Sequence, residues 1–128
     1  MAIKDILDAT SNAISNCEVA AFGDTDTRLM LRACHQNHIR REHLDALCDQ
    51  AAHCFNFIDT ALSLQSEAIE NDADFNEATC VSADKTTIFV RTDFTSPDFL
   101  CLVCTNPQEP DALLKTAHDA LQKINAVQ

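Results

Sequence analysis

"DFLCLVC", residues 98–104, is the stretch that decides the fold. Its two cysteines, Cys101 and Cys104, have the Cys-x-x-Cys spacing that in other sequences marks a zinc knuckle or a redox pair. Such a site needs a turn between the cysteines, and Leu102 and Val103 make a poor turn. In an extended strand, residues three apart point to opposite faces, so the two thiols would not converge. Because both faces of this strand would be apolar, the stretch predicts a central strand covered by helices on both sides.

Four more strand patterns surround this one. "FNEATCVSA" (75–83) and "TTIFVRT" (86–92) precede it and are separated by a gap of hairpin length. Further upstream, "CEVAAF" (17–22) and "RLMLRAC" (28–34) flank a polar turn. In the strand pattern 28–34, alternation puts Leu29, Leu31 and Ala33 on one side and Arg28, Met30, Arg32 and Cys34 on the other. The arginines predict an edge strand with one face in water.

Three helices complete the pattern. Apolar residues recur at helical spacing over 3–14 and along a long segment that begins near Arg41. The apolar stripe of the long helix consists of Leu44, Leu47, Cys48, Ala51, Phe55, Ile58 and Leu62. A last helix follows Asn106, a candidate for its cap, and either Pro107 or Pro110 fits its first turn.

The element order is therefore α-β-β-α-β-β-β-α in one domain, residues 1–128. We expect an α/β fold of the α+β kind. A single, mainly antiparallel five-stranded sheet lies between the long helix on one face and the two terminal helices on the other. The acidic stretch 66–74 is predicted to be a frayed helix end and a loop.

Composition narrows the function classes. The chain of 128 residues has a net charge of −11, which argues against nucleic-acid binding and against anionic membrane surfaces. No apolar run reaches membrane-spanning length, and the N-terminus has no uninterrupted apolar core, so we expect neither a membrane span nor a signal peptide. The predicted location is cytoplasmic. The seven cysteines are then expected to be reduced and mostly buried among apolar neighbours.

The familiar motifs of catalysis are missing from the sequence. It contains neither a GxSxG nor an HExxH pattern, and its single glycine excludes a glycine-rich phosphate loop. We therefore expect no enzyme activity, no cofactor and no native metal site. One metal hypothesis stays open as an alternative, because Cys34, His35 and His38 could supply three zinc ligands from one loop.

Basic residues gather in one part of the chain. Arg28, Arg32, Arg40 and Arg41 fall within a short stretch and alternate with histidines. Such a run is either a solvated face or a surface for a protein partner, and both interpretations stay open. Arginine suits a partner surface because its planar guanidinium can donate two hydrogen bonds to one carboxylate. The four arginines are the candidate partner-binding residues.

The element order and the length resemble the Roadblock/dynein light-chain family. The resemblance covers nearly the whole chain and rests on three places. The hairpin "VAAFGDTDTRLMLRAC" (19–34) is similar to the family's first hairpin. The long helix that begins at Arg41 is similar to the family's long amphipathic helix. The stretch "TTIFVRTDFTSPDFLCLVC" (86–104) is similar to the family's paired last strands. The resemblance implies a homodimeric, non-enzymatic module that acts as a subunit of larger complexes, or as a partner or regulator of small Ras-like GTPases.

The strongest competing interpretation is a type III secretion chaperone, which is also a small, acidic, dimeric α/β protein. Those chaperones place three strands before the long helix and two after it, whereas this sequence predicts two and then three. A strand at "HQNHI" (35–39) would shift the count toward the chaperone. A zinc or thiol-redox protein is the second alternative.

Dimerisation follows from the edges of the predicted sheet. An open sheet exposes unpaired backbone groups at both edges, and proteins protect such edges or use them. The strand 28–34 carries arginines, while 75–83 has little besides Glu77 to discourage pairing. By the resemblance, two copies pair through this second edge and through their long helices. The candidate dimer contacts are Ala52 and Phe55 on the helix and Glu77, Thr79 and Val81 on the strand.

The strand interpretation of residues 98–104 predicts slow thiol chemistry. Cys101 and Cys104 should react slowly with a thiol reagent under native conditions and quickly after denaturation, because burial shields both sulfurs. Labelling followed by peptide mass spectrometry measures both rates. Fast native labelling of both thiols, or a stoichiometric metal in the purified protein, would contradict the interpretation.

Overall fold

The computed structural model describes residues 2–35, 38–64 and 75–128. Its elements follow the predicted order and are α1 (Ile3–Ala13), β1 (Cys17–Asp24), β2 (Leu29–His35), α2 (Arg41–Leu64), β3 (Glu77–Val81), β4 (Lys85–Arg91), β5 (Asp98–Thr105) and α3 (Pro110–Val127). Most boundaries differ from the predicted ones by one or two residues. The acidic stretch 66–74, predicted to fray and form a loop, lies outside the described residues.

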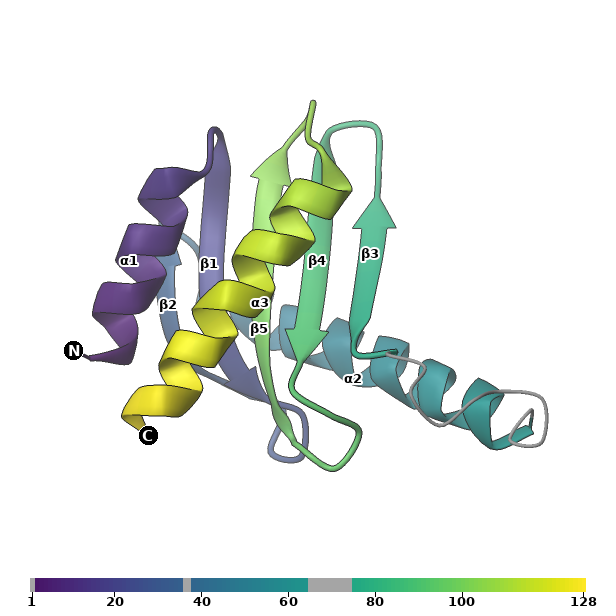
Figure 1. Cartoon of the computed structure of the whole chain (residues 1–128). Coiled ribbons are helices and arrows are strands. Elements are labelled where there is room, and N and C mark those ends of the chain that lie inside the picture. The colour runs from purple at the N-terminus through teal and green to yellow at the C-terminus, as the bar shows by residue number, and fades with distance from the viewer. Residues whose placement is uncertain (1, 36–37, 65–74) are drawn as a thin grey trace.

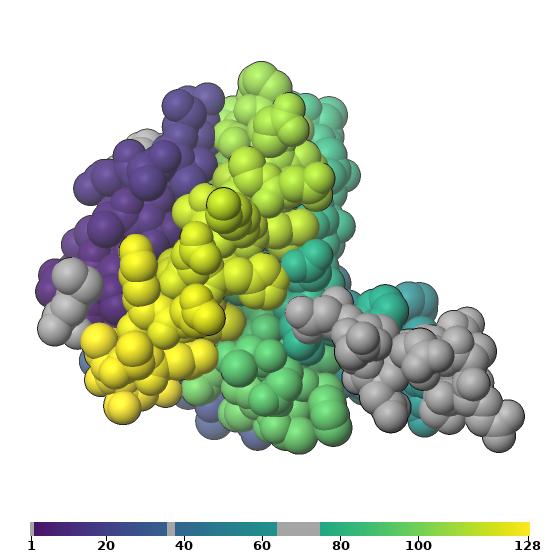
Figure 2. All heavy atoms as spheres, in the orientation of Figure 1, coloured from purple at the N-terminus to yellow at the C-terminus, as the bar shows by residue number. Residues whose placement is uncertain are grey.

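The strands form a single sheet with the order β2-β1-β5-β4-β3, and every neighbouring pair is antiparallel. Helices α1 and α3 lie on one face of this sheet, and α2 crosses the opposite face (Figure 1). In the space-filling view, α1 and α3 lie side by side over their face of the sheet (Figure 2). The predicted fold class is confirmed.

Strand β5 is the central strand, as the "DFLCLVC" pattern predicts. Phe99, Cys101 and Val103 belong to the core between the sheet and α2, and all three are nearly or wholly buried. On the other face, Leu100, Leu102 and Cys104 belong to the core with α1 and α3 and are wholly buried. Cys101 and Cys104 therefore lie in different cores, so the spacing is not a metal knuckle.

Strand β2 is an edge strand, as predicted, but its predicted alternation is wrong. Met30 is only 1% exposed and packs in the core with α2, whereas Leu29 and Leu31 are 45% and 43% exposed. The cause is a bulge. Phe22 pairs with Arg32 but the next residue, Gly23, pairs with Met30, which leaves Leu31 unpaired. One extra residue reverses the alternation that follows it, and no periodicity in the sequence announces it.

The start of α3 also corrects a prediction. Pro110 occupies the first turn, but Asn106 does not cap the helix, whose N-cap is Glu109. Instead, Asn106 Oδ1 accepts a hydrogen bond from Thr86 Oγ1 at 2.6 Å, and its amide donates to the Ser82 carbonyl at 2.8 Å. Asn106 thus ties the end of β5 to the β3–β4 turn.

Gly23, the one glycine of the chain, permits a close approach within the core. A Cβ at this position would lie 2.8 Å from a ring carbon of Phe99 and 3.0 Å from the Met30 sulfur. We expect Gly23→Ala to lower the free energy of unfolding by about 1–3 kcal/mol, because neither buried neighbour can move freely. Urea denaturation measures the loss. Asp26→Glu, which adds one methylene in the exposed turn nearby, should change stability little, and equal effects of the two variants would contradict the packing argument.

Candidate protein-interaction site

An apolar groove runs between α2 and the edge strand β3. Its volume is about 410 Å³, and it is lined by His53, Cys54, Phe57, Ile58, Ala78, Thr79 and Cys80. This set is called the α2–β3 groove below. Phe57, which lines the groove from α2, is 75% exposed, and Val81, on the strand β3 itself, is 65% exposed. A large apolar side chain this exposed on an apolar groove marks a surface that can receive a partner.

Alternation along β3 assigns its residues to two faces. Ala78 pairs with Phe89 of the α2-side core, so Ala78 and Cys80 face α2. Glu77, Thr79 and Val81 point to the face that carries α3, and all three are exposed. Among the described strands, β3 pairs with β4 alone, so its outer edge has no strand beside it.

The opposite edge of the sheet is closed by arginine side chains. Arg41 Nη2 donates a hydrogen bond to the Met30 carbonyl at 2.7 Å, and Arg32 Nη1 donates one to the Leu31 carbonyl at 2.8 Å. A bulge, charged side chains and occupied carbonyls are devices by which proteins prevent edge-to-edge pairing. The two edges therefore differ in kind: β2 is protected and β3 is open.

The four predicted partner-binding arginines do not form one patch. Arg28 pairs with Asp49 of α2 at 3.1 Å, and Arg41 pairs with Asp45 at 3.3 Å, so both are held on the α2 side. Arg32 shares its face with Phe22, on the side of α1 and α3.

Arg40 occupies a different position at the start of α2. Its carbonyl accepts hydrogen bonds from the backbone N–H groups of His43 and Leu44, at 3.0 and 3.3 Å. Its side chain makes no ion pair with any residue that the structure describes. Arg32 also has no ion pair among the described residues, but it donates to the Leu31 carbonyl, whereas the Arg40 side chain has neither an ion pair nor a hydrogen bond within this part of the chain.

The two helix residues predicted at the dimer contact lie mostly inside the chain's own core. Phe55 is 4% exposed and Ala52 is 9% exposed, which leaves them little surface for a second copy. The exposed aromatic side chain on this helix is Phe57, which the sequence argument missed. The available signal was a large apolar residue beside the main stripe, at a position that the helical spacing turns away from the core.

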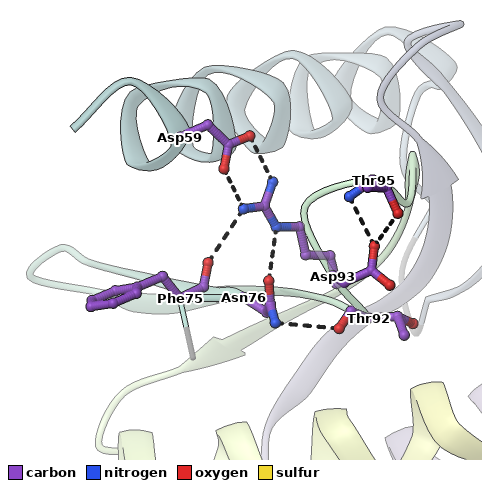
Figure 3. Close-up of polar contacts among 7 residues, drawn as sticks. Asp59, Phe75, Asn76, Thr92, Asp93 and Thr95 are labelled. Carbon is purple, nitrogen blue, oxygen red and sulfur yellow. Dashed lines mark hydrogen bonds and ion pairs between the residues drawn. The ribbon is translucent and has the colours of Figure 1, made fainter. Parts of the chain in front are cut away.

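Arg91 fixes this part of α2 against the sheet. The residue is 4% exposed, and its guanidinium binds both carboxylate oxygens of Asp59, at 3.1 and 2.5 Å. It also donates to the side-chain oxygen of Asn76 and to the Phe75 carbonyl, each at 3.3 Å. Figure 3 shows Asp59 on the helix and Phe75 and Asn76 on the segment that enters β3. One buried cation thus joins α2, β4 and the start of β3.

Two further contacts complete this cluster. The guanidinium carbon of Arg91 lies 4.6 Å from the centre of the Phe55 ring, which is a cation–π distance. In the loop that follows β4, the Asp93 carboxylate accepts hydrogen bonds from Thr95 Oγ1 and the Thr95 N–H, and these bonds lower the pKa of Asp93 (Figure 3). The buried guanidinium of Arg91 is therefore paired with a carboxylate, as a buried charge requires.

A second, polar cleft of about 370 Å³ lies beyond Arg91, between α2 and the loops that follow β1 and β4. Both of its cations, Arg28 and Arg91, are already bound by carboxylates. Asp98 on its wall has a pKa raised by burial and by the nearby Asp24. The α2–β3 groove, which is apolar and borders an open strand edge, is the better candidate for a protein interface.

The structure separates two of the three proposed zinc ligands, Cys34 and His35. Strand β2 extends to His35, so Cys34 and His35 are successive strand residues and point to opposite faces of the sheet. No group of three or more potential ligands comes together in residues 2–35, 38–64 and 75–128. Within the same ranges, no helix is long and apolar enough to cross a membrane.

Comparison with known proteins gives a match in structure only. No protein-family model matches the chain, and no curated protein matches it in sequence. The Roadblock/LC7 domain from Streptomyces avermitilis superposes with a TM-score of 0.80 at 8% identity, over 99% of this chain and 98% of that one. The fold is that of a Roadblock/LC7 domain.

Two further solved structures agree with this Roadblock/LC7 assignment of the fold. An MglB in a tetrameric arrangement has a TM-score of 0.75 at 14% identity, over 95% of this chain and 84% of that one. MglC from Myxococcus xanthus has a TM-score of 0.61 at 15% identity, over 100% of both chains. The chaperone alternative needs three strands before the long helix, and the described residues place β1 and β2 there, with β3, β4 and β5 after it.

The Arg91 cluster predicts that two alanine variants will differ in how much unfolding free energy they lose. Asp59→Ala leaves the buried guanidinium without its carboxylate, and we expect it to lower the free energy of unfolding by about 1–3 kcal/mol; the partial exposure of Asp59 reduces the loss from the fully buried case. Asp49→Ala removes a surface pair whose side chains are 49% and 56% exposed, and it should cost less than about 1 kcal/mol. Chemical denaturation compares the two. Equal losses would show that Arg91 does not depend on Asp59.

Proposed function

We propose that the chain is a non-enzymatic, homodimeric protein-interaction module that serves as a partner or regulator of a small Ras-like GTPase, or as a subunit of a larger assembly. The observation that carries the proposal is an open edge strand, β3, beside an apolar groove in a Roadblock/LC7 fold. The GTPase part of the proposal rests on the resemblance of the sequence to the Roadblock family.

In the proposed dimer, the β3 strands of two copies pair edge to edge and continue the sheet from one chain into the other. A two-fold axis near Thr79, the middle residue of β3, would bring each copy's exposed Phe57 toward the other copy's surface. The long helices would then lie across the same axis. The open β3 edge and the closed β2 edge support this choice of edge.

The tetrameric arrangement of one MglB supports the self-association of similar folds. Each copy of this chain carries a net charge of −11, so two copies repel each other at low ionic strength. Apolar contact in the α2–β3 groove must exceed that repulsion. Salt screens the repulsion over a Debye length of about 10 Å at 0.1 M, so added salt should strengthen the dimer.

The absence of enzyme activity and the cytoplasmic location remain predictions. The described residues contain no set of three or more metal ligands that would support the zinc interpretation. They also place two strands before the long helix, whereas the chaperone interpretation needs three. The structural likeness to Roadblock/LC7 domains supports the remaining interpretation.

The dimer is tested by light scattering of the free protein at micromolar concentration. We expect a mass near twice 14.1 kDa. Thr79→Glu, which sets two like charges near the axis, should weaken association at least about tenfold, a loss of 1.4 kcal/mol. Ala9→Glu adds the same charge at an exposed position on α1 and should leave the mass unchanged. A strict monomer up to high concentration, or equal effects of the two variants, would contradict the proposed interface.

The basic stretch is tested by comparing two arginines. Arg40→Glu reverses a charge that has no described ion pair, so it should weaken binding of an acidic partner surface and leave the fold intact. Arg41→Glu also removes the ion pair with Asp45 and the hydrogen bond to the Met30 carbonyl, so it should additionally lower the stability of the chain. The readouts are thermal unfolding and a pull-down from the native source, with mass spectrometry to identify a retained GTPase or secreted effector. Unchanged retention by Arg40→Glu would favour the solvated-face interpretation.

A further inference from the structure

Two thiols from different elements meet in the α2–β3 groove. Cys54 projects from α2 and Cys80 from β3, and both line the groove. Both are half-buried and pack against the same core cluster. The nearby Cys80 thiol contributes to raising the pKa of the Cys54 thiol.

The other five cysteines differ from this pair in burial or in placement. Cys17, Cys48, Cys101 and Cys104 are buried, and the half-buried Cys34 packs against the core on the α1 and α3 side of the sheet. Cys17 and Cys104 are cross-strand partners, but neither has any exposed surface. Cys54 and Cys80 are therefore the adjacent pair of thiols that a small solute can reach.

We propose that Cys54 and Cys80 form an oxidation site, at which a small-molecule disulfide such as oxidised glutathione converts the two thiols into an intrachain disulfide that joins α2 to β3. From the sequence, the cysteines are expected to be mostly structural, with Cys34 also a candidate zinc ligand. For these two, the tertiary structure adds a neighbour of the same chemistry and access from solvent.

The reaction proceeds in two exchange steps. In the first, the thiolate of one cysteine attacks a sulfur of oxidised glutathione; a protein–glutathione S–S bond forms, the glutathione S–S bond breaks, and one glutathione thiolate leaves. In the second, the thiolate of the other cysteine attacks the protein sulfur of this mixed disulfide, and the second glutathione leaves. The protein loses two protons and two electrons, and one oxidised glutathione becomes two reduced ones.

The environment of Cys54 sets the pH dependence of this chemistry. Burial, followed by the nearby Cys80, raises the pKa of the Cys54 thiol to about 11. Because the thiolate is the reacting form, closure of the disulfide should be slow near neutral pH and should accelerate as the pH rises toward that value. Besides the two thiols, the titratable side chain that lines the groove is His53 on α2, whereas Glu77 on β3 points to the other face and contacts His118 of α3 at 2.7 Å.

The disulfide would act on the elements that form the proposed dimer surface, and this step rests on the proposed function. It would tie α2 to β3 by a covalent bond, in addition to the Arg91–Asp59 ion pair. A second copy seated on the groove would cover both thiols. Oxidation should then slow as the protein concentration rises and the dimer forms.

The test exposes the full-length chain to oxidised glutathione at pH 7 and pH 9, followed by intact mass measurement and non-reducing peptide mapping. We expect a loss of about 2 Da, mapped to a bond between Cys54 and Cys80, and a faster reaction at the higher pH. Cys54→Ser and Cys80→Ser should stop at a mixed disulfide with one glutathione. Cys34→Ser, which removes the half-buried thiol on the other face, should react as the unchanged chain does.

Three outcomes would overturn the oxidation site. They are a disulfide that maps to other cysteines, a disulfide between chains, and reaction only after denaturation. Repeating the reaction over a range of protein concentrations tests the oxidation site and the proposed dimer independently. If the disulfide between Cys54 and Cys80 forms within one chain at a rate that does not depend on protein concentration, the result supports the oxidation site and counts against a dimer that covers the groove.

Discussion

The architecture depends on one constraint: strand β5 is apolar on both faces and must be covered on both. Its six residues from Phe99 to Cys104 alternate between two separate cores, one beneath α2 and the other beneath α1 and α3. A strand of this kind is stable only at the centre of a sheet, where both of its edges are paired and both of its faces are dry. The position of β5 places β1 and β4 beside it and leaves β2 and β3 as the two edges.

The two edges differ in how their backbone is protected, and the proposed interaction surface rests on this difference. At β2, a bulge beside Gly23 and two arginine side chains occupy the backbone that another strand would need. At β3, the strand is short and lies beside an apolar groove with the exposed Phe57 at its rim. An edge of this second kind associates readily unless something covers it, and self-association of a Roadblock/LC7 fold would cover it.

The Arg91 cluster anchors α2 to the sheet close to the groove. A buried guanidinium is costly unless its charge is paired, and Arg91 binds Asp59 of α2 and the chain segment at Phe75 and Asn76. The groove begins next to these residues, since Ile58 and Ala78 line it. The ion pair, the proposed docking surface and the proposed thiol pair therefore share one region, between α2 and the β3 edge of the sheet.

The sequence by itself determined the element order, the central position of β5 and the identity of both edge strands, because periodicity and apolar content are local properties of the chain. It did not reveal the bulge at Leu31, which buries Met30 and exposes its neighbours, since a bulge depends on the partner strand. It placed Phe55 on the apolar stripe of α2, but it named Phe55 and not the exposed Phe57 as a dimer contact, because the spacing does not show how completely the sheet covers a side chain on that stripe. The arginines, grouped in sequence, are divided between two faces, and their partners differ: Arg28 pairs with Asp49, 21 residues away, whereas Arg41 pairs with Asp45 on its own helix. The tertiary structure alone decided which side chains come together, because the ion pair of Arg91 with Asp59 and the shared groove of Cys54 and Cys80 join segments whose distance in sequence carries no information about their distance in space.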